Sequence, residues 1–595
     1  MILTKLVEYY EREANEGRAP RYGWANAKVS WALELAEDGT PLRLLPLNET
    51  VQRGKKNVEV PKIMEVPQPA KRASGVCAQF LCDNAEYILG CADKGKPERT
   101  KQCHEASKEK HLHILEGLDS PAARAITAFF KSWNPAGADA AEGIAAELPQ
   151  VQSGGNIVFR IGECFAEDDP AIRKAWMSAL GNESDAPDGL CMLTGQHAPI
   201  ARLHPAIKGV VGAQPSGGSL ISYNKGKSAF ESFGNEDAQS FNAPVSEYAA
   251  FAYTTALNLL ISDHAHTVRL GDTTIVYWAE QENAACQDLF ASCVFGKESE
   301  HPMTDQTLHA FFEHVREGRS VSYEGLDIPF DNPFYILGIA PNAARLSVRF
   351  FLAGTFGGFL QSTLAHQERM EIVRPKFQEQ ASIPIWQMLG ETVKPQSRDK
   401  SASPLLAGSV LRAILMNDSY PAALYENILL RIRAEHDEHK INFRRAAILK
   451  ACLIKNKGRK ITVALDESST NPAYVLGRLF AVLERIQQDA NPGILATIKD
   501  RYFNAACATP ARVFPVLQKL SQHHLRKLPE KSRAYHEIQV GRIMDLLQMQ
   551  EAPFPRTLSL EAQGIFILGY YHQRQQFFAG KKKTTDKTTN EMEEN

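Results

Sequence analysis

Hydrophobic residues recur at two different spacings along this chain. In roughly the first two thirds, short apolar runs alternate with polar positions or end at turn residues, a pattern that predicts strands. The predicted strands cover residues 29–35, 156–161 and 273–278. In the same part, other apolar residues recur at the three-to-four spacing of amphipathic helices. They predict helices at residues 108–115, 121–133, 246–261 and 343–351.

The last third of the chain has an almost entirely helical pattern. A polar segment with Pro and Ser at residues 390–404 is a predicted linker in front of it. Asn471 followed by Pro472 is a strong helix start, because Asn caps an N-terminus and Pro suits the first helical position. Later amphipathic stretches predict an antiparallel bundle, which a disordered polar tail follows from about residue 581.

The predicted fold class is therefore α+β, with a mixed α/β N-terminal and middle region followed by an all-α helical bundle at the C-terminus. Because 595 residues exceed what one core supports, we expect domains at residues 1–240, 241–400 and 401–595. The most apolar stretch, at residues 249–261, is too short to cross a bilayer. Ten cysteines lack pairing spacings. We expect a soluble cytoplasmic protein with no membrane partner.

The charge balance limits the function classes. A formal net charge of −2 counts against a protein that grips DNA alone, because phosphate neutralisation supplies most non-specific affinity. It is compatible with a subunit that shares its ligand with partners and concentrates positive charge locally. Two dense basic stretches in the C-terminal part do this. Their candidate strand-binding residues are Arg444, Arg445, Lys450, Lys457, Arg459, Arg512, Lys519, Arg526 and Lys527. A solvated helix face is the simpler interpretation of any single one.

A glycine-rich segment supplies a different kind of surface. Glycine lets a backbone approach another chain closely, and neutral amides and hydroxyls can bond to base edges. The candidate residues of this segment are Lys208, Gln214, Ser216, Gly217, Gly218, Ser219, Asn224, Lys225 and Lys227. A glycine-rich surface turn is the alternative.

A second segment has a similar character. Residues 53–72 are basic and contain three prolines, which predicts a loop or an edge strand rather than a helix. Lys71, Arg72, Ser74 and Gln79 then combine cations, a small flexible residue and an amide beside a possible phosphate backbone. A solvated basic turn explains this pattern as well.

Two further groups of residues suggest a contact or a reaction. Arg345 and Arg349 lie four residues apart on one face of the predicted helix at 343–351, where they could hold a phosphate or pair with carboxylates. Asp263, His264 and His266 resemble a fragment of a metal-dependent nuclease site, but no second ligand cluster accompanies them. We therefore expect no catalytic residue, no metal and no cofactor, and keep a cryptic metal-dependent nuclease as the alternative.

Long ordered phrases now point to a family. The opening MILTKLVEYY, the KRASG…FLCDNAEYILG segment at residues 71–90 and the run at residues 191–224 resemble the large subunit of type I-C CRISPR Cascade. The phrases RLGDTTIVYWAE at 269–280 and PFYILGIAPNAARLSVRFF at 333–351 do so too. The likeness continues through the helical C-terminus, so it covers nearly the whole chain.

The resemblance implies a non-enzymatic role in a crRNA-guided antiviral complex. Such a subunit recognises the protospacer-adjacent motif (PAM) in duplex target DNA, helps to separate the strands and stabilises the resulting R-loop. Its implied partners are crRNA, double-stranded target DNA, the displaced single strand, the Cascade backbone and small subunits, and the helicase–nuclease. A scaffold without any direct DNA contact is a further alternative.

The resemblance also assigns roles to the three predicted domains. Residues 1–240 would read the PAM, through the candidates in the two loop segments. Residues 241–400 would contact crRNA and backbone subunits, with Arg345 and Arg349 as candidates. The bundle would resemble the small subunit from about residue 461 and would bind the displaced strand through its basic residues.

Overall fold

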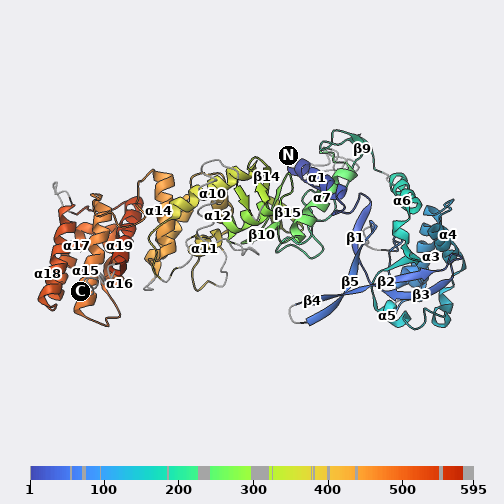
Figure 1. Ribbon diagram of the computed structural model, residues 1–595, viewed down its shortest axis with the longest axis horizontal. Coiled ribbons are helices and arrows are strands. Elements are labelled where there is room, and N and C mark those ends of the chain that lie inside the picture. Colours follow the sequence, from blue (N-terminus) through green and yellow to red (C-terminus); the bar gives the residue numbers. More distant parts are fainter. Residues whose placement is uncertain are drawn as a thin grey trace, which may run out of the picture. The chain divides into compact units, whose positions relative to one another are not determined.

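The chain forms two compact units in a computed structural model (Figure 1). The first unit comprises Met1–Ile207 and Ile221–Leu259, and the second comprises Lys208–Leu220 and Leu260–Asn595. The structure describes residues 2–53, 56–69, 75–93, 96–183, 186–224, 242–296, 321–323, 326–376, 378, 382–397, 402–435, 440–547 and 554–579. The predicted tail from about residue 581 lies outside these ranges.

The first unit combines small sheets with helices. Its strands are β1 (Trp24–Val29), β2 (Trp31–Leu35), β3 (Pro41–Pro46), β4 (Asn48–Arg53), β5 (Lys56–Pro67), β6 (Ile157–Ile161), β7 (Cys164–Phe165), β8 (Asp188–Leu190) and β9 (His197–Pro199). Its helices are α1 (Ile2–Asn15), α2 (Ala85–Ile88), α3 (Pro97–Ile114), α4 (Pro121–Ser132), α5 (Leu148–Ser153), α6 (Pro170–Glu183) and α7 (Glu247–Ser262).

A four-stranded sheet with the order β3-β2-β6-β7 forms the centre of this unit. All five residues of β2 are buried, because both faces of the strand are covered. Leu33 and Leu35 face the core that Phe129 joins, while Ala32 faces a smaller cluster with Val66. Strands β2 and β6 are parallel, and the chain between them supplies helices α2 to α5.

The basic, proline-containing stretch at residues 53–72 is mostly strand. In β5, residues 56–61 pair with β4 and residues 62–67 pair with β1, so each half has one antiparallel partner. Pro61 lies where the partner changes from one strand to the other. A proline is tolerated there because it cannot donate a ladder hydrogen bond. The stretch is therefore not a helix, as expected, but it is a strand that the sheet order places between β1 and β4 rather than a loop or an edge.

The second unit is built on the antiparallel sheet β10-β11-β14-β15. Its strands are β10 (Thr267–Leu270), β11 (Thr273–Ala279), β12 (Val321–Tyr323), β13 (Leu326–Ile328), β14 (Pro333–Asn342) and β15 (Arg345–Thr355). Its helices are α8 (Ala284–Phe290), α10 (Phe356–Met370), α11 (Ile385–Gly390), α12 (Pro404–Leu415), α13 (Ala422–Ala434), α14 (Phe443–Lys457), α15 (Pro472–Ala490), α16 (Ile498–Ala508), α17 (Pro510–Leu525), α18 (Glu530–Asp545) and α19 (Leu560–Ala579).

The predicted helix at residues 343–351 is wrong, because this segment is a turn followed by β15. Asn342 pairs with Arg345, so Ala343 and Ala344 form a two-residue hairpin loop. Ala343 has a φ of +54°, which a helix does not allow. The strand is held by β14 along its whole length, and this pairing overrides the helical propensity of Ala, Arg and Leu.

The C-terminal helices pack closely around α15. Asn471 caps this helix by accepting hydrogen bonds from the N–H groups of Ala473 and Tyr474, which confirms the predicted helix start. Helices α15 and α19 meet at glycines: a Cβ at Gly477 would lie 2.0 Å from the carbonyl oxygen of Phe566. Only glycine permits this backbone approach.

The predicted α+β fold class is confirmed, with mixed α/β segments followed by a helical C-terminal region. One continuous hydrophobic core joins residues on both sides of the predicted linker at 390–404, from Leu270 to Tyr571. The three-domain division stays a prediction. Among the described residues, no helix combines the length and apolar character needed to span a bilayer.

Candidate nucleic-acid interfaces

The glycine-rich segment is anchored to strands β11 and β15 of the second unit. The N–H of Leu346 donates to the carbonyl oxygen of Ser219 over 2.9 Å, and the N–H of Val211 donates to Oγ1 of Thr274 over 3.1 Å. Gly218 is buried against Leu346, where an added Cβ would lie 3.0 Å from the leucine side chain. These contacts fix the position of the residues between 211 and 219.

The anchored segment presents polar side chains to solvent. Gln214 and Ser216 are exposed, and so is Lys208 at the start of the segment. The N–H of Gly217 donates to the carbonyl oxygen of Gln214 over 2.9 Å, which closes a tight turn, and Gly217 has a φ of +93°. The turn therefore presents Gln214 and Ser216 to solvent, a few residues before the anchor at Ser219.

Arg345 and Arg349 are exposed on β15 rather than on a helix. Ser219 forms a parallel bridge with Arg345, so the structure brings the glycine-rich segment beside this arginine. Arg349 lies at a bulge, since Gly338 pairs with Phe350 while Ile339 pairs with Val348. Its guanidinium contacts the carboxylate of Asp272 over 3.3 Å. The carboxylate pairing expected as one alternative is thus present at Arg349.

Other predicted loop residues divide into three groups. Lys71, Arg72, Ser74, Lys225 and Lys227 lie outside the described residues. Asn224 is exposed and belongs to the first unit, whereas Gln214 belongs to the second. Gln79 is 7% exposed and its N–H donates to Asp83 over 2.9 Å, so it is part of the core and we remove it from the DNA-contact set.

Two predicted strand-binding residues on α14 are also part of the core. Arg445 is 4% exposed and its guanidinium bonds to Glu391 over 2.8 Å and to Glu435 over 2.5 Å. Burial alone would raise the pKa of Glu435, but hydrogen bonds from Arg445 and Arg431 outweigh it and lower the pKa. Lys450 is 2% exposed and donates to the carbonyl oxygen of Arg369 over 3.2 Å.

We therefore correct the assignment of Arg445 and Lys450. Both side chains stabilise the fold, and neither is accessible to a displaced DNA strand. The remaining basic residues near them are accessible to different degrees. Arg459 bonds to the carboxylate of Glu561 over 2.6 Å, and Arg444 lies 3.7 Å from Glu391. Lys457 is exposed at the end of α14.

Helix α17 gathers the other predicted cations on one face. Arg512, Lys519 and Arg526 are all exposed and are spaced by seven residues, which is about two helical turns. His523, whose ring the sequence offers for base stacking, is exposed on the same face. The helical period of the three cations is the signal that identifies this face. We call Arg512, Lys519, His523 and Arg526 the α17 stripe.

The surroundings of the α17 stripe favour an anionic ligand. Residues 501–529 contain no Asp or Glu. Within the described part of the chain, Arg512, Lys519 and Arg526 have no ion-pair partner. Lys527 donates to the side chain of Asn491 over 3.1 Å at the edge of the stripe. Positive charge is therefore concentrated along α17.

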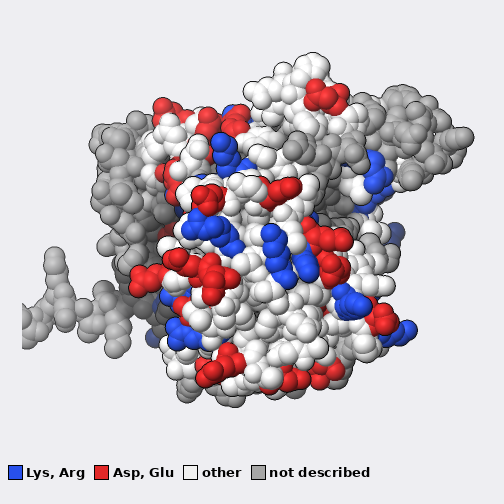
Figure 2. All heavy atoms as spheres, turned by 90° about the vertical axis from the view of Figure 1, so that its right-hand side faces the viewer, with Lys and Arg blue, Asp and Glu red and all other residues white. Residues whose placement is uncertain are grey.

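The face drawn in Figure 2 contrasts with this helix. There, Lys and Arg side chains are interspersed with Asp and Glu side chains, and neither sign dominates an area. This arrangement agrees with the near-zero net charge of −2. The α17 stripe offers the local excess of positive charge that phosphate binding requires.

One histidine of the alternative nuclease site, His266, has a structural role, whereas His264 is exposed. His266 is 6% exposed; its Nδ1 lies 3.0 Å from the carbonyl oxygen of Tyr277, and its Nε2 lies 3.7 Å from the Asp263 carboxylate. Across the described ranges, no group of three or more His, Cys, Asp or Glu side chains could hold a metal ion. No observation supports the nuclease alternative.

A comparison with known families assigns the chain. The family described as CRISPR-associated protein (Cas_Csd1) matches residues 6–578, so the chain belongs to this family of CRISPR-associated proteins. The match confirms the Csd-type resemblance of the sequence, and it is consistent with the I-C subtype. A comparison with the curated proteins finds no match.

Proposed function

We propose that this chain is the large, non-catalytic subunit of a crRNA-guided type I-C surveillance complex. In this role it recognises the PAM in duplex DNA, assists strand separation, stabilises the R-loop and helps to recruit the helicase–nuclease. It acts together with crRNA and with the backbone and small subunits. Membership of the Cas_Csd1 family supports a place in a CRISPR effector complex.

The observation that carries the proposal is the α17 stripe. Proteins that bind single strands combine a positively charged track for the backbone with side chains on which bases stack. The stripe supplies three exposed cations on an acid-free helix, and His523 supplies an exposed ring between them. We assign the displaced strand to this face. Phe503 is 1% exposed, so it cannot serve as a stacking platform.

A second surface supports contacts with duplex DNA and crRNA. Exposed Gln214 and Ser216 sit on a turn that is anchored beside Arg345. Neutral amides can read base edges in a groove, while an arginine fixes the register on a phosphate. We assign Gln214 to PAM reading and Arg345 to a phosphate of the crRNA or target strand, so the two functions share one surface.

The test uses the complex assembled with crRNA and its partner subunits. The R512Q/K519Q/R526Q variant should weaken the R-loop to the same extent on every flanking sequence. The Gln214→Ala variant should instead reduce the preference for the correct PAM. If both variants lose both properties equally, the assignment of two separate surfaces is wrong. If neither variant changes DNA binding, the chain is a scaffold without DNA contact.

A further inference from the structure

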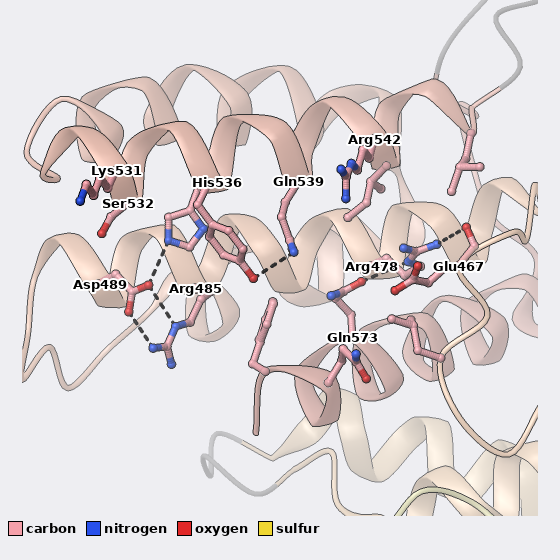
Figure 3. A pocket seen from close by; sticks show the side chains of 16 residues that line it. Glu467, Arg478, Arg485, Asp489, Lys531, Ser532, His536, Gln539, Arg542 and Gln573 are labelled. Carbon is pink, nitrogen blue, oxygen red and sulfur yellow. Dashed lines mark hydrogen bonds and ion pairs between the residues drawn. The ribbon is translucent and has the colours of Figure 1, made fainter. Parts of the chain in front are cut away.

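The C-terminal helices enclose a cavity that the proposed function does not use. It lies among α15, α18 and α19 and has a volume of about 590 Å³ (Figure 3). Helix α18 is attached through few side chains, since only His536 and Ile543 are buried on it. One side of α18 is therefore open toward the cavity, and its side chains form one wall.

The charged side chains on the floor of the cavity have partners within the protein. The guanidinium of Arg485 contacts the carboxylate of Asp489 over 2.9 Å, and Nε2 of His536 lies 3.0 Å from the same carboxylate. Arg478 donates to the carbonyl oxygen of Glu467 over 3.2 Å and to the side chain of Gln573 over 3.1 Å. Arg478 and Arg485 therefore already have hydrogen-bond acceptors within the protein.

The charges on the α18 wall are not paired in this way. Lys531 and Arg542 are exposed and line the two ends of the cavity. Neither has an ion-pair or hydrogen-bond partner among the side chains that the structure describes. They are eleven residues apart on one helix, a separation of about 16 Å. Two cations at this distance suit an extended segment with several carboxylates.

Such a segment occurs in the same chain. Gln576 and Phe577, near the end of α19, line the cavity, so the described part of the chain ends beside it. Among the residues that follow α19 is the acidic sequence Glu591-Met592-Glu593-Glu594. The eleven residues 580–590 precede it and can span at most about 40 Å. Both cations of the α18 wall are within this reach.

We propose that the cavity binds the acidic segment Glu591–Glu594 of the same chain. The carboxylates bind Lys531 and Arg542, and Met592 packs against Phe577 and the other apolar side chains that line the cavity, such as Leu546. This inference goes beyond the proposed function and does not rest on it.

The tether is the reason to prefer this occupant over a nucleic acid. A short tether gives a local concentration in the millimolar range, so a weak attraction is enough to fill the site. A free strand has no such advantage. A nucleic acid would find its cations on α17 instead.

The reactivity of Lys531 toward an acetylating reagent tests the proposal on the full chain. Lys519 of the α17 stripe is the matched control, because it is also an exposed lysine on a helix. Mass spectrometry reports how fast each amine is modified. In the E591Q/E593Q/E594Q variant, Lys531 should react several-fold faster than in the parent chain, while Lys519 should react at the same rate in both. Equal rates for Lys531 in both chains overturn the proposal.

Zero-length carbodiimide cross-linking distinguishes the possible occupants. The expected product is an amide between Lys531 and a tail glutamate within one chain, with a yield that does not depend on protein concentration. The Arg542→Gln variant should lower this yield, because one of the two anchors is lost. Links between two copies, or links from the tail to Lys519 in equal yield, contradict the proposal. A fifteen-thymidine oligonucleotide is then added to the parent chain and to the E591Q/E593Q/E594Q variant. If it protects Lys531 only in the variant, the tail is the resident occupant of the cavity. If it protects Lys531 equally in both chains, the proposal is overturned.

Discussion

Neutralising the α17 stripe should change the salt dependence of single-strand binding by a predictable amount. In the R512Q/K519Q/R526Q variant, three exposed cations lose their charge while the helix keeps its length and packing. Each phosphate contact on a single strand contributes about 0.7 to the slope of log K against log salt, so three contacts contribute about 2. Surface changes of this kind usually alter stability by less than about 0.5 kcal/mol.

The slope converts into a measurable ratio of affinities. The quantity to compare is the ratio of the parent chain's affinity for the oligonucleotide to that of the variant. Between about 50 and 200 mM salt, a slope difference of about 2 lowers this ratio by roughly 15- to 20-fold. Fluorescence anisotropy with a labelled oligothymidine gives the affinity of both proteins at each salt concentration.

A control with the same loss of charge is available in the first unit. Lys101, Arg124 and Lys131 are exposed on α3 and α4, so the K101Q/R124Q/K131Q variant should keep the parent slope. The reasoning is refuted if the control and the stripe variant change the slope equally, or if the stripe variant keeps the parent slope.

The remaining predictions concern stability and base reading. Arg445→Gln should lower the free energy of unfolding by about 3–5 kcal/mol, because it removes the buried cation that bridges Glu391 and Glu435 and leaves Glu435 with Arg431 alone; a loss below about 1 kcal/mol in urea denaturation would disagree. Glu167 is 2% exposed, no described residue bonds to its carboxylate, and burial raises its pKa to about 8. This pKa lies above the unfolded value, so the stability that its proton provides is lost as the pH rises toward 8. Glu167→Gln should therefore raise Tm increasingly from about pH 5 to 8, and a constant difference would contradict the buried acid. Gln214→Ala should cost about 1–3 kcal/mol of discrimination between correct and incorrect PAMs, measured as a ratio of Kd values; an unchanged ratio would exclude base contact.

Much of the fold could be predicted because local patterns and tertiary packing agree. Asn471 and Pro472 start a helix, and the apolar period beyond them is the face that α15 buries. The pattern misled at residues 343–351, where good helix formers occupy a hairpin loop and a strand. Pairing with β14 decides this segment, and a local pattern carries no information about a partner strand.

The candidate site could be predicted only in part, because charge along a sequence does not tell which face a residue occupies. Both α14 and α17 carry an arginine and a lysine in a basic stretch of sequence. Arg445 and Lys450 of α14 are buried, whereas Arg512 and Lys519 of α17 are exposed. The seven-residue spacing and the missing carboxylates of α17 are readable in the sequence. The anchoring of Gln214 beside Arg345 is not, since about 130 residues separate them.

The central claim is that this chain contributes nucleic-acid contacts to a larger guided complex. The most direct test compares guide-loaded assemblies with and without the chain, using targets whose flanking sequence is randomised. The account predicts that the complete assembly selects a narrow set of flanks and forms R-loops on them, and that the assembly without this chain does neither. Equal selection and equal R-loop formation by both assemblies would contradict it.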